Sequence, residues 1–228
     1  MHGTDSAAKT QVETMALAFW SPSAAIDRVA SLRSPWLIQA VILTLQLVVA
    51  TLAWRFVLEV RIGLLSDSSD RSVLEAAERT FRVAGYLMLI MTPVKLFLWW
   101  YIGAGFLHIL DVLFNAREQP FSRMFSLAVF ASAYSSLSDL HVLLVWYVRG
   151  VSAFTSPEAL NVPIGLNLIP VIWSSYWYAL MGHFNLYEGA TTTATAFGFV
   201  RLTGSSWIPS YLCIFGAWLA LSAIKSMF

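Results

Sequence analysis

Charged residues are scarce in this sequence. Aspartate, glutamate, lysine and arginine make up 12% of its 228 residues, whereas ordinary soluble domains carry about 25%. The mean hydropathy of +0.67, together with 10 tryptophans, 15 phenylalanines and 8 tyrosines, indicates a surface that faces lipid. The formal net charge of +1 argues against nucleic acid as a partner, because phosphate binding needs a concentrated basic face.

Cysteine is nearly absent as well. Cys213 is the single one and lies in an apolar run, so no intrachain disulfide can form, and one thiol alone is a poor metal site. We interpret Cys213 as a small buried hydrophobic residue. Residues 1–15 contain no apolar core of the signal-peptide type, so we expect no cleaved leader, and the first membrane helix would then serve as the insertion signal.

The sequence also lacks the familiar enzyme motifs. It contains no His-Glu-x-x-His, no Gly-x-Ser-x-Gly, no phosphate loop and no Gly-x-Gly-x-x-Gly. We therefore predict a protein without enzymatic activity, with no catalytic residue and no metal site, and its cofactors stay unknown. Gly103 and Gly105 in their apolar helix indicate packing, and the run Trp99-Trp100-Tyr101 indicates a surface facing lipid or other helices.

Long apolar runs predict five membrane spans. Trp36 to Trp54 contains no charged residue, which is close to the about 20 residues needed to cross a bilayer, and tryptophan at both ends is typical of interfacial anchoring. We predict an all-α integral membrane protein, a five-transmembrane-helix bundle with an N-terminal amphipathic interfacial helix. The expected spans cover about residues 36–56, 83–111 with a kink at Pro93, 123–148, 166–184 and 206–225.

The segments between these runs are expected outside the hydrocarbon. Residues 1–16 are polar and predict a flexible tail. Ser21 as N-cap and Pro22 as first helical residue predict a short amphipathic helix over 21–33 that lies in the membrane interface, although any short connector before a span has a similar pattern. Residues 72–82 predict a helix with a solvated face. Residues 188–203 are ambiguous, and one interpretation is a short interfacial helix.

A few ionisable residues interrupt the apolar runs. His108 and Asp111 lie one turn apart on one helix face, Asp139 and His141 point in different directions, and we expect Asp111 and His183 near the same membrane face. Ionisable groups inside a membrane are functional candidates, as proton relays or metal ligands. The alternative is structural: a helix-end pair of His108 and Asp111, and Asp139 as a buried group that bonds two helices together. The candidate polar cluster comprises His108, Asp111, Asp139, His141 and His183.

The order of these patterns resembles the Yip-domain family, the Ypt/Rab-interacting membrane proteins and their bacterial relatives. The matching stretches are 19–29 with Ser34-Pro35-Trp36, the region from Gly103 through Phe121 to Tyr134, and 167–173. Family members often carry a proline after the position of Tyr134, where this chain has Ser138-Asp139-Leu140-His141. The resemblance implies five helices and a cytosolic N-terminus, and it supplies no catalytic residues.

The resemblance also decides the expected orientation. Six lysines and arginines would lie on the N-terminal side and seven on the other, so the positive-inside rule gives no answer by itself. We expect a multi-pass protein of the bacterial cytoplasmic (inner) membrane with its N-terminus in the cytoplasm. Its partners would be membrane lipids and other membrane proteins or a larger membrane complex.

Three functions follow from these patterns. The first is a non-enzymatic Yip-like protein that assists a transport, trafficking or membrane-organising machine. The second is a structural accessory subunit of a larger membrane complex, for example photosynthetic, respiratory or exporting. The third is a small transporter that uses Asp139 and the histidines.

Overall fold

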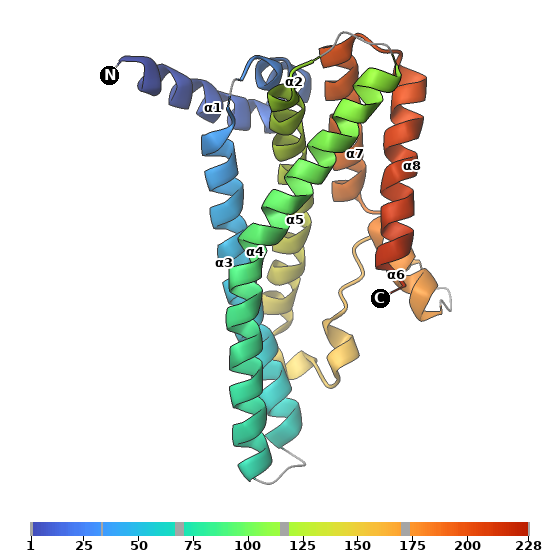
Figure 1. Cartoon of the computed structure of the whole chain (residues 1–228). Helices are drawn as coiled ribbons and strands as arrows, with labels where there is room; N and C mark the ends of the chain where they lie inside the picture. Colours follow the sequence, from blue (N-terminus) through green and yellow to red (C-terminus); the bar gives the residue numbers. More distant parts are fainter. Residues whose placement is uncertain (1, 33, 67–70, 115–118, 170–173, 228) are drawn as a thin grey trace.

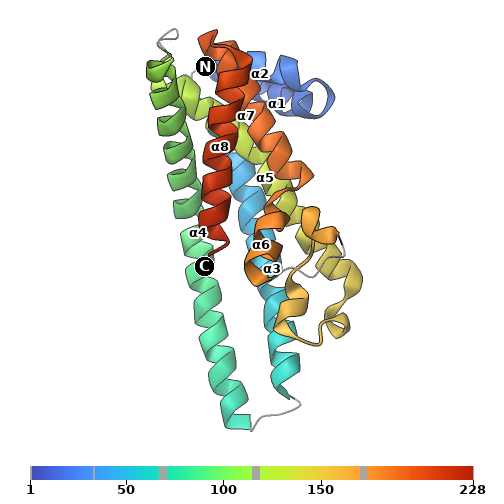
Figure 2. The same ribbon diagram turned by 90° about the vertical axis from the view of Figure 1, so that its right-hand side faces the viewer.

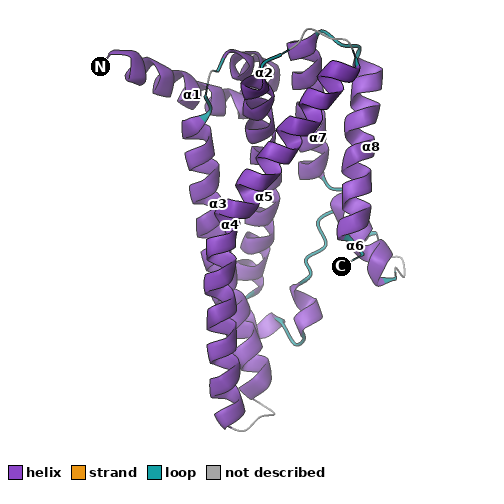
Figure 3. Cartoon of the chain, in the orientation of Figure 1, coloured by secondary structure: helices purple, strands orange, loops and turns teal. Residues whose placement is uncertain are grey.

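The computed structural model describes residues 2–32, 34–66, 71–114, 119–169 and 174–227. Across these residues the regular structure is helical, with one isolated β-bridge between Gly165 and Asn185. The long helices lie side by side and alternate in direction along the chain (Figures 1 and 3). In order, the elements are α1 (His2–Trp20), α2 (Pro22–Ser31), α3 (Trp36–Ser66), α4 (Arg71–Leu113), α5 (Phe121–Arg149), the 3-10 turns η1 (Val151–Ala153), η2 (Pro157–Leu160) and η3 (Leu166–Leu168), α6 (Ser175–His183), α7 (Leu186–Thr203) and α8 (Trp207–Lys225).

Four of the described helices are long and apolar enough to cross a membrane: α3, α4, α5 and α8. They fit an integral, multi-pass membrane protein. They contain four of the five expected spans, those at about 36–56, 83–111, 123–148 and 206–225. Figure 2 shows that α3 and α4 continue well beyond the end of α8, so one end of the bundle consists of fewer helices.

α4 is one helix rather than two joined ones. It runs through Pro93 without a break and changes direction about half-way along its length (Figure 1). Proline has no backbone N–H to donate to the carbonyl of Leu89 one turn earlier, and its ring crowds that turn, so a bend is the expected outcome. The upper half of α4 leans over α5, and the lower half follows α3.

The predicted span over 166–184 is wrong as a continuous helix. The described residues there form η3 and then the nine-residue α6, and Ile169 and Ser174 between them both have extended backbone. Ile169 precedes Pro170, and the proline ring disfavours helical backbone in the preceding residue. The next helix is instead α7, over the residues for which the sequence predicted a short interfacial helix, and it packs against α5 and α8.

The predicted flexible tail over 1–16 is also wrong, because residues 2–20 form α1. Gln11 is buried, and its side-chain oxygen accepts hydrogen bonds from the backbone N–H groups of Leu37 (2.8 Å) and Ile38 (3.4 Å). These N–H groups belong to the first turn of α3 and have no partner within that helix. Polar residues of α1 therefore cap a neighbouring helix.

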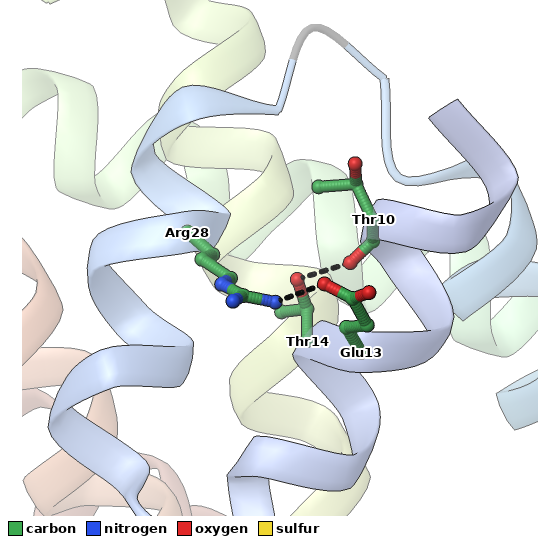
Figure 4. A network of polar contacts seen from close by, with 4 residues as sticks. All are labelled: Thr10, Glu13, Thr14 and Arg28. Atoms are coloured by element: carbon green, nitrogen blue, oxygen red, sulfur yellow. Dashed lines mark hydrogen bonds and ion pairs between the residues drawn. The ribbon is translucent and has the colours of Figure 1, made fainter. Parts of the chain in front are cut away.

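Figure 4 shows how α1 is held against α2. The guanidinium Nη1 of Arg28 donates to Oε2 of Glu13 at 2.6 Å, and the Thr14 hydroxyl donates to the carbonyl of Thr10 at 2.7 Å. Both charged side chains are partly exposed, so the ion pair itself contributes only about 0–1 kcal/mol.

The helix predicted at 21–33 is present as α2, with Ser21 at the N-cap position and proline next. The Ser21 hydroxyl makes no capping hydrogen bond. Ala25, Ile26 and Val29 are buried against Phe130 of α5 and against α7. Protein therefore covers the apolar face of α2, while Asp27 on the opposite face is exposed and lies 3.8 Å from the Arg201 guanidinium of α7.

The largest cluster of buried hydrophobic residues lies where α4, α5, α7 and α8 meet. It includes Leu107, Leu127, Phe199 and Ile214. Cys213 lies next to this cluster in sequence, yet its thiol is exposed, so its interpretation as a buried residue is wrong. Only one narrow face of α8, with Ser210, Ile214 and Ser222, packs against the other helices. Cys213 lies outside that face.

Candidate functional site

Asp139 of α5 bonds to a neighbouring helix. Its Oδ2 accepts a hydrogen bond from Nε2 of Gln46 of α3 at 3.0 Å. Gln46 lies about 15 Å along α3 from Trp36 and about 12 Å from Trp54, at 1.5 Å per residue. Since the α3 sequence between these tryptophans has no charge, Asp139 and Gln46 lie near the middle of an apolar layer. The Asp139 side chain is exposed at the protein surface, not buried as the structural alternative expected.

His141 bonds in a different direction, as its position two residues after Asp139 predicts. Its Nδ1 is hydrogen-bonded to the hydroxyl of Tyr187 of α7 at 2.9 Å, and the two rings meet edge to face. α5 thus carries one polar contact to α3 and another to α7 within a single turn. α5 itself is helical from Phe121 to Arg149, through the stretch where family relatives often have proline.

Glu188 continues this arrangement into α8. Asn185 is the N-cap of α7, and its side-chain oxygen accepts from the backbone N–H of Glu188 at 3.0 Å. Oε2 of Glu188 accepts from the indole Nε1 of Trp218 at 3.3 Å, and Asp139 lies within electrostatic range of it. We call the residues that link α3, α5, α7 and α8 the polar band: Gln46, Asp139, His141, Tyr187, Glu188 and Trp218.

His183 lies beside the polar band, at the end of α6. Its imidazole is about half-buried and lies within electrostatic range of the Lys225 ammonium. The Lys225 ammonium lies 4.6 Å from the centroid of the Trp99 ring of α4. Lys225, the last residue of α8, therefore brings a cation to the level at which α6 ends and α7 begins.

His108 and Asp111 form no part of this arrangement. They lie near the opposite end of the bundle, where Oδ2 of Asp111 accepts from the backbone N–H of Gln119 at 2.7 Å and His108 meets the edge of Phe121. Asp111 is buried, and its Oδ1 and His108 Nδ1 lack hydrogen-bond partners. The prediction that Asp111 and His183 lie near the same membrane face is wrong, because α4 ends at one end of the bundle, whereas α6 meets α7 about half-way along it (Figure 1).

The five candidates therefore separate into two groups. Asp139 and His141 lie in the polar band with Glu188, which the sequence interpretation missed, and His183 is linked to Glu188 only through the charge of Lys225, which acts on both. The signal that would have found Glu188 is Asn185-Leu-Tyr-Glu188: an N-cap residue followed three positions later by glutamate marks a helix start directly after a charge-free run. Among the described residues, no three His, Cys, Asp or Glu side chains are grouped closely enough to hold a metal ion.

A groove opens beside Glu188, between the start of α7 and α8, and it encloses about 240 Å³. One wall comes from the chain around the α6–α7 break and the other from aromatic residues of α8. We call it the α7–α8 groove. Its lining consists of Leu166, Phe184, Asn185, Gly189, Thr192, Tyr211, Phe215 and Trp218.

A scan against protein-family models, a search of curated proteins and a search of solved structures found no match to this chain. The resemblance to the Yip-domain family therefore stays a prediction.

Proposed function

We propose that the chain crosses the membrane five times, through α3, α4, α5, α7 and α8. α7 supports this because Glu188 and Arg201 are the only charged residues among its 18 residues. The residues between them are uncharged and include buried Thr192, Ala196 and Phe199. α7 runs antiparallel to α5 and α8, and the broken α6 segment continues its path (Figure 1). The resemblance adds a cytoplasmic N-terminus in a bacterial inner membrane, with α2 at that interface.

The function that the geometry supports best is proton translocation by a small, non-enzymatic membrane transporter. The observation that carries it is the polar band, in which Asp139, His141 and Glu188 occupy one level of four helices. A charged aspartate at the centre of a bilayer costs about 2.5–3.5 kcal/mol on insertion scales. The hydrogen bond to Gln46 alone does not explain why an aspartate stands at position 139. An asparagine side chain would accept the same hydrogen bond without the cost of burying a charge.

The neighbouring break in the chain supports the same function. α6 ends at His183 and α7 begins at Leu186, so backbone groups that a continuous helix would pair are bonded in other ways: the Phe184 carbonyl accepts from the Leu166 N–H at 3.1 Å, and the Gly182 carbonyl from Nδ2 of Asn185 at 2.9 Å. Transporters place substrate and ion sites at such discontinuous helices near the bilayer midplane. In this chain the break lies beside Glu188 and His183, and the ionisable side chains and the break occupy one level of the bundle.

Proton flux into liposomes tests the proposal. We expect the purified chain to acidify the lumen, read by a trapped pH-sensitive dye, when a potassium diffusion potential is imposed. Asp139→Asn keeps an acceptor for Gln46 but removes the proton-binding group, so it should lower the flux at least tenfold. Asp27→Asn, an exposed position of α2, is the matched control and should leave the flux unchanged. A wild-type flux equal to that of empty liposomes, or full flux in Asp139→Asn, rejects the proposal.

The accessory-subunit function is the second candidate, and Lys95 favours it. Lys95 lies exposed on α4 among exposed apolar residues, including Val94, Leu98 and Ile102. It lies about 15 Å along α4 from Gly85, which packs against the lower interfacial residue Trp54. An ammonium group at this depth is costly, and the carboxylate of a partner helix would compensate it.

A further inference from the structure

Four aromatic rings line the α7–α8 groove, three from α8 and one from the α6–α7 break. Tyr211 and Phe215 stack at 6.0 Å with an angle of 7° between their planes, and Phe215 meets Trp218 at 5.2 Å. Phe184, from the α6–α7 break, meets the Trp218 ring edge to face at 5.1 Å. Rings held by one another in this way keep their faces at fixed positions along the groove. Aromatic faces carry partial negative charge and attract cations.

The Glu188 carboxylate lies next to the groove, on the lining residue Trp218, and is not itself among the lining residues. Oε2 of Glu188 is held by Trp218, which itself lines the groove, and Oε1 forms no hydrogen bond with a described residue. The nearest described cation is Lys225, whose ammonium lies over the Trp99 ring and forms no ion pair with Glu188 within 4.0 Å. Glu188 therefore keeps an oxygen available to a second cation.

The groove has room beside this carboxylate. A Cβ atom built on Gly189 meets no other atom within 4 Å. The groove is open on one side, and its volume of about 240 Å³ is below the about 300–1,000 Å³ of sites for drug-sized ligands, so the part of a ligand that it holds is small. The start of α7 does not attract an anion here, because Asn185 already caps it and Glu188 occupies its first turn.

We infer that the α7–α8 groove binds a small organic ammonium ion, a solute whose transport is coupled to proton translocation but is not required for it. Phe184, Tyr211, Phe215 and Trp218 hold its charged head group by cation–π attraction, and Glu188 neutralises it. This assignment rests on the proposed function, since it names the substrate class of the same polar band. Rings alone would accept any apolar group, so the carboxylate is what makes the site selective for a cation.

Equilibrium binding of radiolabelled choline to the purified full-length chain in a non-ionic detergent tests this inference. Choline should bind at least tenfold more tightly than 3,3-dimethylbutan-1-ol, its neutral isostere, measured by competition. Glu188→Gln retains an acceptor for Trp218 and should weaken choline binding at least tenfold. Glu78→Gln, on the exposed face of α4, is the matched control and should bind as the wild type does.

A second variant tests the place of the site without changing its charge. Gly189→Leu fills the space beside Glu188 and should also weaken choline binding at least tenfold. Circular dichroism and size-exclusion chromatography show whether each variant is folded. Equal competition by the neutral alcohol, no binding by the wild type, or unchanged binding in folded Gly189→Leu overturns the inference.

Two further comparisons distinguish a failure of the ammonium site from a failure of the proposed function. Choline should bind with the same affinity in phosphatidylglycerol nanodiscs and in phosphatidylcholine nanodiscs. Weaker binding in phosphatidylcholine would mean that the lipid head group occupies the groove, and it would overturn the inference that the ligand is a free solute. Proton flux without choline binding removes the ammonium site and leaves the proposed function intact. Choline binding without proton flux removes coupled transport, and with it the role assigned to the solute.

Discussion

Gly165 lies where the chain between α5 and α6 turns back on the end of α6. A Cβ atom at this position would lie 2.7 Å from the carbonyl oxygens of Met181 and Gly182 and 2.9 Å from that of Phe184. The backbone N–H of Leu166 also donates to the Phe184 carbonyl at 3.1 Å. These are backbone contacts, so no flexible side chain is available to move aside.

We therefore expect Gly165→Ala to destabilise the chain by about 1–3 kcal/mol, the usual cost of overpacking. The measurement is the midpoint of thermal unfolding in detergent. Gly216→Ala in α8 is the control, because a Cβ there meets nothing within 4 Å and alanine favours a helix. An unfolding midpoint equal to that of the wild type would contradict the described contact between Gly165 and α6.

For some polar residues, the type of residue and its local sequence do not predict its place in the structure. Gln11 was interpreted as part of a solvated tail, yet it is buried at the start of α3. Glu188 passed unnoticed among the threonines of α7, although it bonds to Trp218 across two helices. In both cases the partner is far away in the sequence, 26 positions for Gln11 and 30 for Glu188. Nothing in the local pattern identifies such a partner.

At the scale of elements, α7 decides how many times the chain crosses the membrane. Its threonines lower its mean hydropathy, and it is not among the four helices that hydropathy alone selects. Hydroxyl groups of Thr191, Thr192 and Thr195 each donate to a carbonyl four residues earlier in the same helix. Their polar atoms are thus satisfied within the helix, which makes α7 less costly in lipid than its composition indicates.

Five passes predict that the two ends of the chain lie on opposite sides of the membrane, whereas four passes would place them on one side. The measurement is protease protection of N- and C-terminal tags in sealed right-side-out and inverted vesicles. A tag inserted after Ser66, the last residue of α3, serves as the internal reference, because α3 ends away from the N-terminal side in both topologies. Two terminal tags digested from the same side would contradict a crossing by α7.

α4 shows how much a run of apolar residues leaves open. The sequence permitted either one bent helix or two helices at Pro93, and the structure has one. Thr92 donates its hydroxyl to the carbonyl of Met88 at 2.9 Å, so the turn before the proline keeps a polar contact. Close packing of Gly85 on Trp54 fixes the lower half of α4 to α3, and the bend lets the upper half reach α5.

At the scale of the whole molecule, the exposed surface of α4 is the largest unexplained feature. Exposed side chains occupy most positions from Val83 to Leu98, and only a narrow stripe that includes Gly85 faces α3. Lipid covers apolar residues at little cost. Lys95 is different, because among the described residues it has no ion pair.

A partner that supplies a carboxylate to Lys95 should copurify with the chain from its native membrane in a mild detergent. We expect Lys95→Met to retain at least tenfold less of that partner, quantified by mass spectrometry, because the variant has no charge to pair. Lys9→Met, an exposed position of α1, is the control and should retain the partner fully. A wild-type chain that migrates alone on native gels would remove the accessory-subunit function.

The sequence by itself determined that this protein is helical and lives in a membrane. Apolar runs of fixed length depend only on the composition of consecutive residues, so α3, α5 and α8 were predictable from residues that follow one another. The tertiary structure alone decided which polar residues meet. Asp139 finds Gln46 on α3, and Glu188 finds Trp218 on α8, through packing between distant segments. A local pattern contains the period of a helix but not its neighbours.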